Sequence, residues 1–160
     1  MVPVSKYRIV VALSLICLFT AACAAEKKVS KEQLPAAVKT TADAQSKGAT
    51  VAGYSSDTED GKLEYEVNLK VDGHSKDVTI APDGRVLEIE EEVAMDKLPS
   101  AVRDGLTGKA GKGTIGKVES LTKYRSQAWT LVAYEAQVVT SGKHSEIQVG
   151  PDGKSLRHEE

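Results

Sequence analysis

Apolar residues recur with a helical period in two stretches of the chain, near residues 34–42 and 98–106. In each stretch, apolar or small residues fall at positions i, i+3, i+4, i+7 and i+8, a spacing that places them on one face of an α-helix. They are Leu34, Ala37, Val38, Thr41 and Ala42 in the first stretch, and Leu98, Ala101, Val102, Gly105 and Leu106 in the second. Pro35 and Pro99 stand at the two starts, where the first helical turn tolerates proline. Two short helices are predicted.

After each predicted helix the period changes to two, which is typical of strands with one buried face. The alternating apolar residues are Leu63, Tyr65, Val67, Leu69 and Val71 in the first half, and Val132, Tyr134, Ala136 and Val138 in the second. Turn motifs such as Asp72-Gly73 separate further strands carrying Val78, Ile80, Leu87, Ile89, Ile147, Val149 and Leu156. With short first strands at 51–54 and 115–118, each half is expected to be a helix followed by four strands.

The two halves also resemble each other in sequence. The segment 31–39 recurs at 95–103, and Pro82-Asp83-Gly84 recurs as Pro151-Asp152-Gly153. The distance along the chain between matching residues is 64 for the first of these segments and 69 for the second. The second half therefore has five extra residues between Ile115 and Trp129, which a longer loop or hairpin would accommodate. The predicted fold class is α+β, with two tandem modules at 25–93 and 94–160, each an N-terminal helix packed on a four-stranded antiparallel sheet.

The N-terminal 24 residues have the organisation of a signal peptide. Lys6 and Arg8 precede an apolar run at 9–19, which is shorter than the roughly 20 residues of a membrane-spanning helix. Two processing sites remain open. Cleavage before Ala25 fits the small-x-small rule, whereas residues 20–23 resemble a lipobox that would leave a lipid-bearing Cys23. The expected location is periplasmic or secreted, or alternatively lipid-anchored in the cell envelope, with Cys23 as the only membrane attachment.

Removal of residues 1–24 changes the composition of the chain. The remaining 136 residues carry a formal charge of −4, because the segment holds two of the 21 basic residues and none of the 23 acidic ones. This balance argues against nucleic acid as a partner. Both cysteines also lie in the removed segment, so the mature chain is expected to be stabilised by packing without a disulfide.

The chain resembles PepSY-like envelope proteins, which are related in architecture to the tandem-repeat β-lactamase inhibitor proteins. The resemblance rests on the Leu-Pro-Ala-Ala-Val opening at 34–38, its echo at 98–102, the tyrosine-bearing strands and the Pro-Asp-Gly turns. It implies a non-enzymatic periplasmic or secreted module that binds or restrains a peptidase or another envelope protein. These motifs are structural, so they indicate a fold rather than a target.

The side chains available for catalysis agree with a protein that is not an enzyme. The three histidines, His74, His144 and His158, lack metal-ligand spacing, and neither a nucleophile elbow nor a phosphate-binding loop is present in the sequence. No catalytic residue, metal ligand or cofactor is therefore predicted.

Two features are candidates for binding. Glu64, Glu66, Glu88 and Glu90 are expected on the polar face of their strands, where they would attract a basic peptide or a divalent cation, or merely remain solvated. Trp129 and Leu131 are out of phase with Val132 and are expected on the outer face, unless a β-bulge buries them. The preferred function is binding or inhibition of another envelope or extracellular protein through the sheet surface. The alternative is a module that senses a small ligand or a divalent cation.

Overall fold

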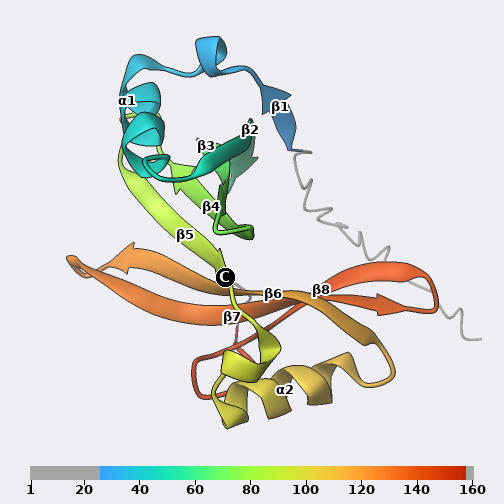
Figure 1. Ribbon diagram of the computed structural model, residues 1–160. Coiled ribbons are helices and arrows are strands. Elements are labelled where there is room, and N and C mark those ends of the chain that lie inside the picture. Colours follow the sequence, from blue (N-terminus) through green and yellow to red (C-terminus); the bar gives the residue numbers. More distant parts are fainter. Residues whose placement is uncertain (1–25, 158–160) are drawn as a thin grey trace, which may run out of the picture.

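The computed structural model describes residues 26–157, which form two α-helices and eight strands (Figure 1). The predicted signal peptide, Cys23 and His158 lie outside the described residues. The helices are α1 (Ala36–Gln45) and α2 (Ser100–Ala110), each preceded by a 3₁₀ turn. The strands are β1 (Lys27–Val29), β2 (Thr50–Glu59), β3 (Lys62–Val71), β4 (His74–Ile80), β5 (Val86–Glu92), β6 (Thr114–Arg125), β7 (Ala128–Thr140) and β8 (Lys143–Val149). No helix within 26–157 is long and apolar enough to cross a membrane.

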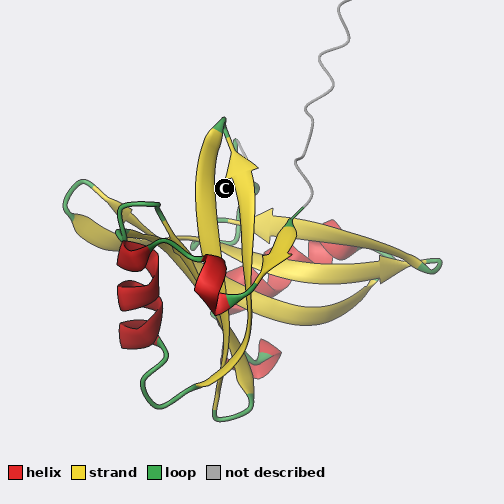
Figure 2. Ribbon diagram, turned by 90° about the horizontal axis from the view of Figure 1, so that it is seen from above, coloured by secondary structure: helices red, strands yellow, loops and turns green. Residues whose placement is uncertain are grey.

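All eight strands belong to one antiparallel sheet in the order β1 to β8. The predicted fold of two modules, each a helix on its own four-stranded sheet, is therefore wrong. The halves are joined because β5 pairs with β4 on one side and with β6 on the other, through pairs such as Glu88 with Lys123. Figure 2 shows how strongly this sheet twists, so that strands at its two ends run in crossed directions.

The strand inventory explains why the two-module prediction failed. Residues 154–156 form no strand, although one was expected around Leu156, so the second half contributes three strands. The first half contributes five, because the short β1 pairs with β2. A period of two identifies strands and their faces, but it does not say which strands exchange hydrogen bonds.

The insertion in the second half lengthens one hairpin. Strands β6 and β7 have 12 and 13 residues, against 10 each for β2 and β3. The prediction of a longer loop or hairpin between Ile115 and Trp129 is confirmed. The additional length carries Tyr124 and Trp129 toward the tip of the hairpin.

Both helices pack on the same face of the sheet, which we call the helical face. Val78 pairs with Ile89, and Ile89 pairs with Thr122. Ser120 lies on the same side of β6 as Thr122 and pairs with Tyr134, so the side chains of these residues share one face of the sheet. One core lies under α1 and a second under α2. Most of the core residues predicted from sequence are buried, namely Leu34, Val38, Val67, Leu69, Leu98, Val102, Ala136 and Val138, and Tyr65 and Tyr134 pack at the core edges.

Each helix is held against the sheet by a Pro-Asp-Gly turn. In the first half, the Thr41 hydroxyl donates a hydrogen bond of 2.6 Å to the carbonyl oxygen of Gly84. In the second half the approach is closer, since a Cβ on Gly153 would lie 2.0 Å from the carbonyl oxygen of Ala101, and a Cβ on Gly105 would lie 2.0 Å from that of Gly153. Because glycine has no Cβ, the backbone of α2 can lie in direct contact with the backbone of the turn at these positions.

Candidate functional site

The face of the sheet opposite the two helices, which we call the open face, carries a groove lined almost entirely by acidic residues. Its volume is about 400 Å³, and nine of its twelve lining residues are Asp or Glu. The lining residues are Glu26, Ser55, Asp57, Glu59, Glu64, Tyr65, Glu66, Thr79, Glu88, Glu90, Glu135 and Glu146. We refer to this feature as the acidic groove. Ligand-binding pockets commonly have volumes of about 300–1,000 Å³, so it has the size of a binding site.

The acidic groove contains all four glutamates proposed from the sequence. Glu64 and Glu66 project from β3, and Glu88 and Glu90 project from β5. They lie on one face because alternate residues of a strand point to the same side and the register aligns Glu66 with Thr79 and Thr79 with Glu88. The curvature and twist of the sheet then bring Glu135 of β7 and Glu146 of β8 to the same groove.

Lysines neutralise part of the negative charge on the open face. Lys123 Nζ lies 2.9 Å from a carboxylate oxygen of Glu88, and both side chains are at least four-fifths buried. Lys117 Nζ lies 2.7 Å from Glu119 Oε1, and Glu119 is 4% exposed. Both lysines extend from β6, which crosses the middle of the open face.

Burial and mutual repulsion raise the pKa of several groove carboxyls. For Glu66, desolvation and then the charge of Asp77 raise the pKa to about 7, although Asn68 donates a hydrogen bond to its carboxylate. For Glu90, desolvation, a hydrogen bond with Glu88 and the charges around it raise the pKa to about 9. Desolvation likewise raises the pKa of Glu64 and of Glu135. These carboxyls are therefore harder to ionise than exposed ones, and a bound cation would favour their charged forms.

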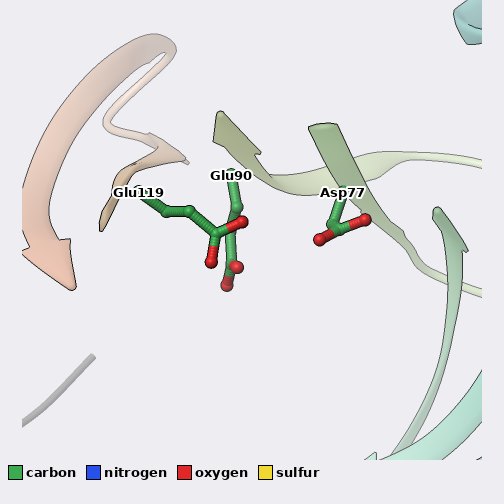
Figure 3. Close-up of side chains that lie close together, drawn as sticks. All are labelled: Asp77, Glu90 and Glu119. Carbon is green, nitrogen blue, oxygen red and sulfur yellow. The ribbon is translucent and has the colours of Figure 1, made fainter. Parts of the chain in front are cut away.

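Three carboxylates at the centre of the open face converge from neighbouring strands. One oxygen each from Asp77, Glu90 and Glu119 lies within 4.8 Å of the others, on β4, β5 and β6 respectively (Figure 3). The hydroxyl of Ser75 donates a hydrogen bond of 3.2 Å to Glu119 Oε1. Carboxylate oxygens are the ligands that calcium and magnesium prefer, so this cluster has donor chemistry suited to a divalent cation.

Sequence reasoning missed several members of this surface. Glu135 occupies the position in the second half that Glu66 occupies in the first, because Tyr65-Glu66 recurs as Tyr134-Glu135, so the repeat contained a signal for it. Glu119 follows the core residue Val118 and so faces the other side of β6. Ser55 has no distinguishing pattern in the sequence, because its burial depends on how β2 pairs with β1 and β3.

Trp129 and Leu131 do not belong to the acidic groove. They pair with Tyr124 and Thr122, whose side chains point to the helical face. A β-bulge at Val132 shifts the phase of β7, so Trp129 and Leu131 lie on the same face as Tyr134 rather than opposite it, contrary to the prediction from parity. Trp129 is nonetheless 45% exposed, because it lies near the hairpin tip, beyond the region that the helices cover.

An aromatic pair occupies that hairpin tip. The rings of Tyr124 and Trp129 meet edge to face with centroids 5.4 Å apart. With Arg85, Val86 and Leu87 they line a shallow pocket of about 340 Å³. The two binding features proposed from the sequence are thus separate surfaces on opposite faces of the sheet.

Comparison with known proteins identifies the fold. No protein-family model matches the chain, and no curated protein is significantly similar in sequence. Several solved structures have a fold similar to that of this chain. A protein of Bacteroides eggerthii described as periplasmic has a TM-score of 0.59 at 19% identity, over 78% of this chain and 86% of that one. A BLIP-like protein of Bacteroides fragilis has a TM-score of 0.53 at 19% identity, over 78% and 84%.

A member of the DUF2874 family from Bacteroides uniformis is also similar, with a TM-score of 0.58 at 16% identity, over 77% of this chain and 86% of that one. The chain therefore has the fold of these BLIP-like and periplasmic proteins. The neighbour from Bacteroides eggerthii is described as periplasmic, and export is what the N-terminal sequence of this chain predicts. Identities below 20% establish the fold and not the activity.

Proposed function

We propose that this chain is an exported, non-enzymatic protein of the bacterial periplasm that binds a basic segment of another protein through the acidic groove. The observation that carries the proposal is the gathering of nine carboxyl-bearing residues in one groove, on the face of the sheet that neither helix covers. A concentrated negative field attracts positively charged partners and accelerates their association. A structural neighbour is described as BLIP-like, and inhibition of a peptidase is one outcome that binding through the acidic groove would have.

Position-dependent photo-cross-linking in intact cells tests this proposal. A photoreactive amino acid at Glu59 or Glu146, both exposed at the rim of the groove, should yield a discrete protein adduct. The same amino acid at Asp104 on α2, or at Trp129, should not yield that adduct. Combining the rim probe with Glu64→Gln and Glu66→Gln should reduce the yield about fivefold, because two carboxyls that a cationic partner would hold ionised are removed from the groove.

A matched control separates a groove effect from a general effect of charge. Glu91→Gln together with Asp104→Asn removes the same number of charges from exposed positions outside the groove, and should leave the adduct yield unchanged. Adducts that form equally from Asp104 or Trp129, or that persist after Glu64 and Glu66 are neutralised, would contradict the proposal.

A second candidate function is divalent-cation binding by Asp77, Glu90 and Glu119, whose oxygens lie within 4.8 Å of one another. Calorimetric titration of the exported protein with calcium or zinc should then give saturable heat. It should also release protons from the Glu90 carboxyl, whose pKa is raised. Asp77→Asn, which keeps the shape of the side chain, should weaken binding about tenfold or more. A titration without saturable heat would rule this candidate out.

A further inference from the structure

A buried hydroxyl on the floor of the acidic groove lacks a hydrogen-bond partner. Ser55 is 2% exposed, and its Oγ is the one buried side-chain polar atom without a partner among residues 26–157. The large majority of buried hydroxyls are hydrogen-bonded, so an exception within a binding-sized groove points to a group that arrives with a ligand. Ser55 lies on the open face because its register partner is Glu66.

The surroundings of Ser55 define the chemistry of that group. On the open face, Ser55 lies between Lys28 of β1 and Glu66 of β3, with Asp57 two residues further along β2. Lys28 is exposed and does not line the groove, whereas Asp57 and Glu66 do. Carboxylates and a hydroxyl oxygen all accept hydrogen bonds, so a group with several N–H donors and a positive charge matches this end of the groove.

An alkylammonium group fits better than the other common cations. A lysine ammonium is a compact charge with three donors on a slender, flexible stem, whereas an arginine guanidinium is a planar fork suited to pairing with two oxygens of one carboxylate. A single divalent ion suits the cluster of Asp77, Glu90 and Glu119, which does not include Ser55.

We infer that the acidic groove receives lysine side chains of the partner, and that Ser55 Oγ accepts a hydrogen bond from one lysine ammonium group beside Glu66. This inference rests on the proposed function and specifies which side chain of the partner is recognised. Glu135 and Glu146, from the opposite end of the sheet, line the same groove and provide carboxylates for a second lysine of the same segment.

Calorimetry with defined cations tests the inference. The probes are a blocked peptide with three lysines separated by glycines, the matching arginine peptide, and spermidine, each titrated into the exported protein at pH 8 and low ionic strength. Ser55→Ala should weaken binding of the lysine peptide about fivefold to tenfold and that of the arginine peptide less than about twofold, because a hydrogen bond to a charged group is lost only with lysine.

Two controls distinguish loss of a ligand contact from damage to the fold. Ser56→Ala changes the neighbouring serine, whose side chain points to the helical face, and should leave affinity for the lysine peptide unchanged. Ser55→Ala should also leave the melting temperature equal or slightly higher, since it removes an unpaired buried hydroxyl. Lower affinity with undiminished stability identifies loss of a ligand contact.

The possible results separate the inference from the proposed function. If Ser55→Ala leaves the affinity for the lysine peptide unchanged, or weakens both peptides equally, the inference is overturned even where the groove still cross-links to a partner. Tighter binding of spermidine than of the lysine peptide would mean that the groove recognises a free polyamine rather than a lysine of a partner protein. That result would also overturn the inference. Loss of the position-dependent adduct, by contrast, removes the proposed function itself.

Discussion

Replacing Gly153 with alanine should lower the free energy of unfolding by about 3 kcal/mol, because two costs add. Gly153 has φ +77°, a left-handed conformation that costs a residue with a Cβ about 1–2 kcal/mol. The new Cβ would also lie 2.0 Å from the carbonyl oxygen of Ala101, so the turn and α2 must move apart, and overpacking of this kind costs about 1–3 kcal/mol. The melting temperature should fall by about 10 °C.

Gly142→Ala is the matched control for this substitution. Gly142 has φ +78°, but a Cβ there would meet nothing within 4 Å, so only the conformational cost of about 1–2 kcal/mol applies. Denaturant unfolding of both variants should therefore show a clear excess loss for Gly153→Ala. Equal losses would mean that the close packing of α2 on its turn contributes nothing to stability.

Replacing Glu90 with glutamine should stabilise the protein at pH 8, by at most about 5 kcal/mol, and have little effect near pH 4. The pKa of Glu90 is raised to about 9 in the folded chain, chiefly by desolvation, and stands near 4.5 when the chain is unfolded. Between these values the folded state binds more protons at Glu90 than the unfolded state, so the contribution of Glu90 to stability is most favourable below about pH 4.5 and becomes less favourable as the pH rises toward 9. An uncharged amide in place of Glu90 removes this contribution.

The charges that face Glu90 come from every neighbouring strand, so the prediction depends on the whole cluster. They are Asp77 on β4, Glu88 on β5, Glu119, Lys117 and Lys123 on β6, and Glu135 on β7. Chemical unfolding of wild type and Glu90→Gln between pH 4 and pH 9 measures the effect. Glu146→Gln, at the exposed rim, should change the unfolding free energy by less than about 0.5 kcal/mol at every pH. A difference between wild type and Glu90→Gln that does not grow with pH would refute the assignment.

Trp129 illustrates where reasoning from periodicity fails. Counting by twos from Tyr134 places Trp129 on the opposite face, but one extra residue at Val132 reverses the count. The bulge arises from pairing between β6 and β7, which leaves no clear trace in the local pattern of apolar residues. Trp129 is exposed, as the sequence predicted, but the reason is its position near the hairpin tip and not the strand parity from which that exposure was predicted.

Local sequence determined the helices, most of the strands, their buried residues and the polar character of Glu64, Glu66, Glu88 and Glu90, because these depend on side-chain spacing along one segment. Only the tertiary structure decided that β5 pairs with β6, which turns two expected sheets into one, since backbone hydrogen bonds carry no side-chain identity. That pairing, with the twist of the single sheet, brings Glu135 and Glu146 to the glutamates of the first half and forms the acidic groove around Ser55.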